Sequence, residues 1–115
     1  MAATVYDYFQ QALRRPSSGV AAGPMVRDAE DNLAVFHVTH KDGRIAGATF
    51  RATTCVTLLA LCEHLCHLAE GLTIKDAEAV DAGRLLALHP EIPPARHNRA
   101  ELAVRAFHQA LQGIQ

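Results

Sequence analysis

The chain has 115 residues, half of them hydrophobic, which suits one compact domain spanning residues 1–115. Lys and Arg number 11 against 12 Asp and Glu, so the net charge of -1 gives no general reason to bind nucleic acid or an anionic membrane. No apolar stretch approaches the roughly 20 residues that span a bilayer, and the N-terminus does not resemble a signal peptide. We therefore expect a cytoplasmic protein. Three cysteines, an odd number, argue against a disulfide framework and leave free thiols or metal ligands.

The N-terminal segment predicts one helix followed by a break. Thr4 to Arg14 is typical of a helix, with Thr4 as its cap and Asp7 three residues later. The run Pro16-Ser17-Ser18-Gly19 ends it. Val20 to Arg27 is weakly patterned and predicts either a loop or an edge strand.

A β-hairpin is predicted next. Leu33 to His40 is rich in residues that favour strands. Asp42-Gly43 is a strong signal for a two-residue hairpin turn, and Ile45 to Ala52 supplies the returning strand. We therefore expect two neighbouring antiparallel strands in this part of the chain.

The central helix is predicted to open at Thr54 or Cys55 and to close at Gly71. Cys55, Cys62 and Cys66 fall on one stripe of it, but three ligands strung along it would span about 16 Å at ~1.5 Å per residue, too far for one ion. Cys62 and Cys66, one turn apart, could share a metal. Leucines flank this stripe, so it is the core-facing side, and we interpret both thiols as buried packing residues.

Cys55 is the best candidate for chemistry. The unpaired N–H groups and the positive dipole end at a helix start favour a thiolate, which can serve sulfur transfer or metal binding. Glu63 and His67, four residues apart, predict an exposed helix pair rather than a ligand pair. The remaining histidines match no recognised ligand spacing, and we expect a role only for one that the fold brings near Cys55. They are His37, His40, His64, His89, His97 and His108.

The C-terminal half is predicted to be helical. Thr73 caps a short helix, and Asp81 to Leu88 makes a further turn or two. Glu91 to Pro94 is an extended linker. Asn98 begins the last helix as its cap, supported by Glu101. One apolar stripe follows, formed by Ala103, Ala106, Phe107, Ala110, Leu111 and Ile114.

These elements predict an α+β fold, with a small three-stranded antiparallel sheet and helices packed on one of its faces. The sequence gives no indication of an enzyme. The glycines of Gly19 to Gly23 lack the G-K-[ST] ending of a phosphate loop, and there is no G-x-S-x-G elbow.

The run from Asp42 to Ala77 combines a D-G hairpin turn, a cysteine before a long helix, and the helix end Glu70-Gly71-Leu72-Thr73-Ile74-Lys75-Asp76-Ala77. It resembles the middle of the NifU/IscU-type iron-sulfur cluster scaffold family, whose helix ends in K-G-K-S-L-D-E-A at the same spacing. Cys55 falls on the second cluster-ligating cysteine of that family. The resemblance implies a NifU/IscU-like fold with an iron-sulfur cluster or iron at Cys55.

A second matching segment is Ile92-Pro93-Pro94-Ala95-Arg96, which resembles the family's L-P-P-V-K. In some members that segment docks a dedicated heat-shock-type chaperone. Leu102-Ala103 followed by Ala106 resembles the L-A-x-x-A of the last helix. The resemblance therefore implies partner binding through Ile92, Pro93, Pro94, Ala95 and Arg96, with a cysteine desulfurase as a further partner. A homodimer is a separate hypothesis, for the case that the chain is an interaction module.

Two of the family's three ligand cysteines have no counterpart. Asp28-Ala29-Glu30-Asp31-Asn32 replaces its C-G-D motif, and Asn98-Arg99 replaces its H-C pair. A cluster of the usual kind needs about four thiolate-like ligands. The family fold brings the three loops to one tip, so the resemblance implies a mixed metal site of Cys55, Glu30 or Asp31, and His97, a set of atoms that suits ferrous iron or zinc.

Arg99 favours a different chemistry at the same tip. A cation beside Cys55 repels a metal and favours a thiolate, which suits a one-cysteine sulfur acceptor. Three hypotheses follow: an iron-sulfur assembly protein that binds iron or a cluster weakly or assists a scaffold, a persulfide acceptor, and an interaction module that kept the fold without the chemistry.

Overall fold

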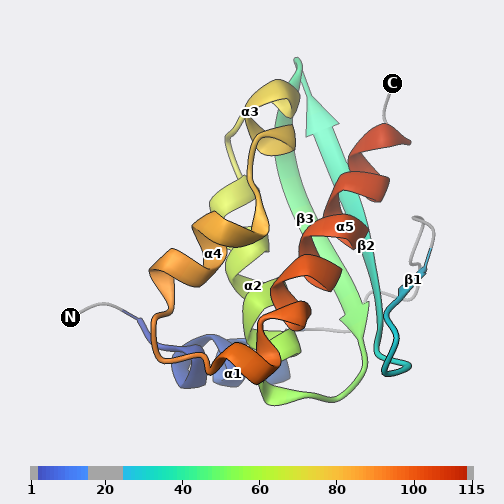
Figure 1. Ribbon diagram of the computed structural model, residues 1–115. Coiled ribbons are helices and arrows are strands. Elements are labelled where there is room, and N and C mark those ends of the chain that lie inside the picture. Colours follow the sequence, from blue (N-terminus) through green and yellow to red (C-terminus); the bar gives the residue numbers. More distant parts are fainter. Residues whose placement is uncertain (1–2, 16–24, 114–115) are drawn as a thin grey trace.

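The sheet consists of three antiparallel strands in the order β1 (Val26–Arg27), β2 (Leu33–Lys41) and β3 (Arg44–Ala52). The computed structural model describes residues 3–15 and 25–113. Helices pack on one face of the sheet, as Figure 1 shows, with α5 against β2 and α2 against β3. The predicted α+β class and three-stranded sheet are therefore confirmed. The expected loop or edge strand at 20–27 is an edge strand at its end, while residues 20–24 lie outside the described ranges.

The hairpin between β2 and β3 forms at the predicted turn. Asp42 and Gly43 both have positive φ, 55° and 76°, the combination that a type I′ turn requires. Phe36 stands opposite Phe50 in the register, with their ring centroids 5.8 Å apart. The far end of the hairpin is tied to the end of α2, because Ile45 N–H donates to the Leu72 carbonyl at 2.8 Å.

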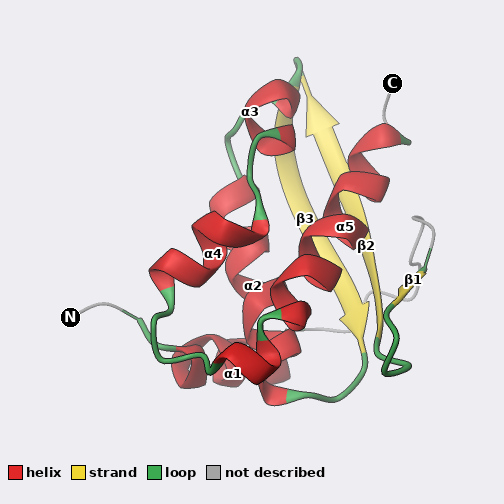
Figure 2. Ribbon diagram, in the orientation of Figure 1, coloured by secondary structure: helices red, strands yellow, loops and turns green. Residues whose placement is uncertain are grey.

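Five α-helices begin and end close to their predicted positions, and Figure 2 shows them in red. They are α1 (Val5–Arg14), α2 (Val56–Ala69), α3 (Ile74–Glu78), α4 (Ala82–Leu88) and α5 (Asn98–Gln112). The 3-10 helix η1 (Pro94–Arg96) was not predicted and begins at the last residue of the expected linker. Thr4 and Asp7 form the predicted reciprocal cap of α1, and Thr73 caps α3 by accepting from the Asp76 N–H. None of the helices in the described ranges has both the length and the apolar composition that a bilayer crossing requires.

The cap predicted for the last helix is wrong, although the helix does begin at Asn98. η1 runs almost directly into α5, and His97 between them already has helical angles, φ -63° and ψ -26°. No side chain caps the helix there. The Asn98 amide instead donates to Glu30 at 2.8 Å and connects α5 to the loop before β2.

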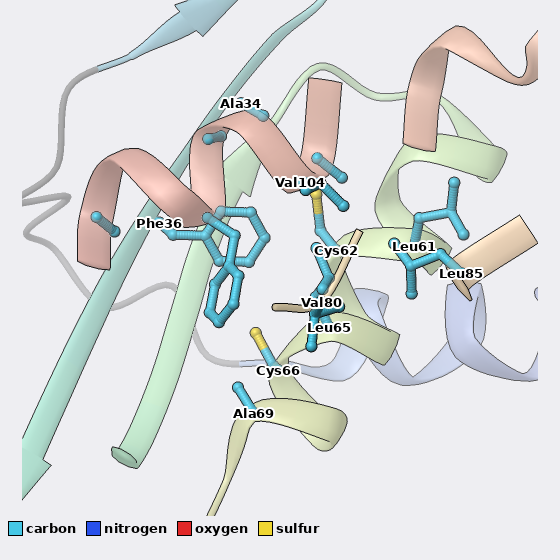
Figure 3. Close-up of a cluster of buried hydrophobic side chains, with 14 of the residues drawn as sticks. Ala34, Phe36, Leu61, Cys62, Leu65, Cys66, Ala69, Val80, Leu85 and Val104 are labelled. Atoms are coloured by element: carbon cyan, nitrogen blue, oxygen red, sulfur yellow. The ribbon is translucent and has the colours of Figure 1, made fainter. Parts of the chain in front are cut away.

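The core lies between the sheet and the helices α2 and α5. Ten of the 14 residues of α2 are buried, which makes it the central element of the fold. Cys62 and Cys66 are 0% and 2% exposed, and Figure 3 shows both among core side chains such as Phe36 and Val104. The interpretation of these two thiols as packing residues is therefore confirmed.

The expectation that Glu63 is an exposed helix residue is wrong. Its side chain is only 4% exposed, and both of its oxygens accept from Arg15, at 2.8 and 2.7 Å. His67 is the expected i, i+4 partner and lies 2.8 Å from the same carboxylate. α1 covers this flank of α2, and the sequence pattern of α2 alone does not reveal that cover.

We predict that Leu58→Ala lowers the free energy of unfolding by about 2–5 kcal/mol, because Leu58 is fully buried in the first turn of α2. Leu13→Ala is the matched control. Leu13 is 63% exposed, so its truncation should change stability by less than about 0.5 kcal/mol. Urea unfolding curves measure both. A Leu58→Ala loss no larger than the control's would contradict the placement of this turn in the core.

Candidate functional site

Cys55 lies at the junction between β3 and α2. It is the N-cap residue of α2, with extended backbone angles of φ -142° and ψ 125°, and its side chain makes no capping hydrogen bond. Thr53 fixes the approach, because its N–H donates to the Leu33 carbonyl at 2.9 Å and its hydroxyl accepts from the Leu33 N–H at 2.8 Å. The thiol is partly exposed. A rigid junction therefore presents a free sulfur at the start of a helix.

Arg99 is the charged neighbour of this thiol. It belongs to the first turn of α5, and its side chain is only 14% exposed. The Cys55 thiol beside it raises the pKa of Arg99, burial works in the opposite direction, and Glu30 adds to the rise. The Arg99 Nη1 lies 3.2 Å from the Glu30 carboxylate. The guanidinium thus interacts both with the sulfur of the α2 N-cap residue and with a carboxylate from the loop before β2.

The loop that carries Glu30 is a tight acidic turn. The Asp28 carboxylate accepts from the N–H groups of Glu30 and Asn32, both at 2.9 Å. Burial by itself would raise the pKa of Asp28. The hydrogen bonds from Asn32 and Glu30 and the charge of Arg99 instead hold this pKa below its ordinary value. Asp31 follows with a φ of 64° and pairs with Arg27 at 3.3 Å. This turn directs Glu30 toward α5 and leaves Asp31 on the surface.

The structure brings together two of the four residues predicted as metal ligands. Cys55 and Glu30 both meet Arg99. Asp31 pairs with Arg27 instead, and His97 Nε2 lies 3.1 Å from the Ile92 carbonyl. Within the described ranges there is no group of three His, Cys, Asp or Glu side chains placed to hold a metal ion. As arranged, these four side chains do not fit iron or zinc, because two of them point to other partners and the remaining two both interact with the positive charge of Arg99.

The predicted partner segment divides into a buried and an exposed part. Ile92 is 5% exposed and belongs to the core. Pro93, Pro94, Ala95 and Arg96 are exposed on and before η1. Ile92 therefore anchors the segment, and the four residues after it form its accessible surface.

A polar cluster that sequence patterns did not reveal lies where α1, α2 and the end of α4 meet. Its members are Tyr8, Arg15, Glu63, His64, His67 and His89, of which Glu63, His64 and His89 are buried. Burial by itself would raise the pKa of Glu63, but the Arg15 guanidinium and His67 hold it below its ordinary value. The sequence did contain an indication of this cluster. The central helix is apolar on most sides, which is typical of a buried helix, and the polar residues of a buried helix require hydrogen-bond partners.

A pair of buried histidines forms the deepest part of this cluster. His64 Nδ1 and His89 Nε2 are 2.6 Å apart, and the residues are 8% and 1% exposed. Tyr8 stacks on the His64 ring, with centroids 4.1 Å apart and planes within 11°. Burial, His89 and His67 together lower the pKa of His64 to about 4. Both histidines were expected to be unremarkable side chains, and their contact depends on the loop after α4.

Comparisons with known proteins define the fold only. No protein-family model and no curated protein matches the chain. A solved structure described as "Crystal structure of a hypothetical protein at 2.3 A resolution" superposes with a TM-score of 0.68 and 17% sequence identity, over 94% of this chain and 96% of that one. At this identity the match shows a shared fold across nearly the full length of both chains. It leaves the NifU/IscU resemblance as a proposal.

We predict that one of the three thiols reacts with a disulfide reagent in the native protein. Cys55 is partly exposed, whereas burial raises the pKa of Cys66 to about 12 and holds that of Cys62 well above its ordinary value. Absorbance titration should count one thiol in buffer and three in denaturant. Cys55→Ser should show none in buffer, and rapid reaction of Cys62 or Cys66 in the folded protein would contradict their placement in the core.

Proposed function

We propose that the chain is a divergent NifU/IscU-like protein that assists iron-sulfur cluster assembly by accepting sulfur on Cys55 from a cysteine desulfurase. The observation that carries this proposal is the Arg99 guanidinium beside a single accessible thiol. The proposal also rests on the sequence resemblance over Asp42 to Ala77. Arg99 stands where the family has its third ligand, so a cation replaces a thiolate.

The transfer of sulfur to Cys55 requires only a thiol on this chain and a persulfide on the desulfurase. The Cys55 thiol gives its proton to solvent, and its sulfur attacks the outer sulfur of the persulfide on the desulfurase cysteine. A new S–S bond forms at Cys55 as the bond to the donor cysteine breaks, and the donor leaves as a thiolate that regains a proton. A persulfide is a stronger acid than a thiol, so Cys55 would then carry an anion beside Arg99.

Arg99 supplies what an anionic sulfur requires. Its Nε has no hydrogen-bond partner among the described residues, so one donor of the guanidinium is unused. A charge-assisted hydrogen bond from such a donor stabilises an anion. The same charge opposes a cation at this position. Iron or a cluster at Cys55 with Glu30 would require Arg99 to leave, which makes metal binding the second proposal for this tip.

The partners and location follow from the same proposal. Three free thiols suit a reducing cytoplasm. The exposed residues Pro93, Pro94, Ala95 and Arg96 are the surface that we propose for a heat-shock-type chaperone, by resemblance to the family's docking segment.

We predict that incubation with a cysteine desulfurase and cysteine, without iron, adds one sulfur to Cys55. Mass spectrometry of alkylated peptides should locate it there, and Cys55→Ser should carry none. Arg99→Gln keeps the size of the side chain and removes its charge. It should reduce the persulfide yield about fivefold, the equivalent of ~1 kcal/mol for a partly exposed charged pair.

Arg105→Gln is the control for a general loss of positive charge, since Arg105 is an exposed residue further along α5. It should accept sulfur like the unmodified protein. Absence of any sulfur on Cys55 under conditions where a known acceptor is loaded would reject the sulfur-transfer role. That result, with partner binding unchanged in Cys55→Ser, would favour the interaction module.

A further inference from the structure

α1 packs against α2, but none of its ten residues is fully buried. Val5 is partly buried against the core, and polar and aromatic contacts add to the attachment. An open groove of about 580 Å³, lined by Val5 and Tyr6 on one side and Leu88 and Pro90 on the other, separates its start from the end of α4. A helix without a fully buried residue depends in part on such specific contacts to stay in place.

The Arg15–Glu63 pair holds the chain just after the end of α1, and a second, continuous series of contacts runs from the start of α1 through the buried histidines. The Val5 N–H, the first of α1, donates to Glu91 Oε2 at 3.0 Å. The same oxygen lies 3.7 Å from His89 Nδ1, His89 contacts His64 at 2.6 Å, and His64 stacks on Tyr8. This series of contacts therefore begins at Val5, the first residue of α1, and ends at Tyr8, one turn later in the same helix.

The proton arrangement of the histidine pair follows from its surroundings. His89 Nδ1 has no hydrogen-bond partner within the described ranges and faces the Glu91 carboxylate. A proton on that nitrogen is favourable, whereas a lone pair there would face a negative charge. His89 Nε2 is then the acceptor and His64 Nδ1 the donor. His64 Nε2 is left as the one unprotonated nitrogen of the pair that does not take part in their hydrogen bond.

We propose that the neutral His64–His89 pair is a pH-sensitive latch, which holds α1 against α2 and releases it when His64 takes up a proton. A second proton on His64, taken up at Nε2, places a charge on a ring that is 8% exposed and stacked on Tyr8. Release of α1 exposes that ring to water. This device is independent of the sulfur-transfer proposal.

The other charged groups around His64 do not reverse this effect. His67 and His89 disfavour a further positive charge. The face of Tyr8 attracts a cation, but it is the contact that release would break. Glu63, the nearest carboxylate in sequence, is already engaged by Arg15 and His67, and Glu91 is engaged by the Val5 N–H.

The pH window follows from the lowered pKa of His64, about 4 in the folded protein against 6.5 ordinarily. Because the released state binds the proton more tightly, the latch is fully closed above about pH 6.5 and loosens as the pH falls toward about 4. Uptake of one proton on opening raises the opening constant about tenfold per pH unit in this interval.

Amide hydrogen exchange between about pH 7 and pH 5, corrected for the intrinsic pH dependence of exchange, tests the latch. The opening constant of α1 amides should rise about tenfold per unit below pH 6.5, while α5 amides keep their protection. His64→Phe keeps a ring against Tyr8 but cannot take a proton, so its α1 opening should be independent of pH. His40→Phe, at an exposed position in β2, should behave like the unmodified protein.

Three results would overturn the latch: α1 protection that does not change over this range, parallel loss of protection in α1 and α5, or an unchanged pH slope in His64→Phe. Should His64→Phe not fold, the comparison of α1 with α5 in the unmodified protein decides by itself. A tenfold rise in the α1 opening constant per pH unit, with α5 amides still protected, supports the latch. Either of the first two results rejects it.

Discussion

The burial of α2 on nearly every side is the constraint on which the rest of the structure depends. The sheet and α5 cover its apolar faces, and α1 covers the flank that carries Glu63 and His64. An ionised carboxylate in such a position is stable only with partners that compensate it. Arg15 and His67 provide that compensation. The placement of α1 is therefore a consequence of polar residues within a buried helix.

The same helix determines where the accessible chemistry can be. Its two inner cysteines lie in the core, so only the thiol at its N-terminus meets solvent. α5 packs beside α2 and brings Arg99 to this end, while Asn98 and Glu30 connect α5 with the loop before β2. The tip is thus assembled from three segments far apart in the sequence. At this tip the Cys55 thiol and the Glu30 carboxylate both interact with the Arg99 guanidinium, an arrangement that suits an anionic sulfur better than a cation.

Local signals in the sequence were sufficient for the elements of the fold. The Thr4–Asp7 cap, the Asp42-Gly43 turn and the α+β class were all predictable, because each depends on residues close together in the chain. Asn98 was mistaken for a cap because the 3-10 turn before it left no mark in the pattern. The burial of Glu63 and the His64–His89 contact were also out of reach, since both depend on which distant segment covers α2.

The predicted metal ligands likewise divide into positions that the sequence indicates and side-chain directions that it does not. The sequence placed Cys55 at the start of the central helix, where the structure has it, and the position of Arg99 beside it was anticipated from the family resemblance. The directions of Asp31 and His97 depend on local hydrogen bonds to Arg27 and Ile92 that sequence patterns do not specify. The choice between sulfur and metal at the tip therefore depends on one guanidinium.

The most direct test of the account offers Cys55 both alternatives at once. The protein is incubated anaerobically with a cysteine desulfurase, cysteine and ferrous iron, and then analysed by native mass spectrometry. The account predicts one added sulfur on Cys55, no retained iron and no cluster absorption bands. Retention of iron or of a cluster that depends on Cys55 would contradict it and restore the metal-binding interpretation of this tip.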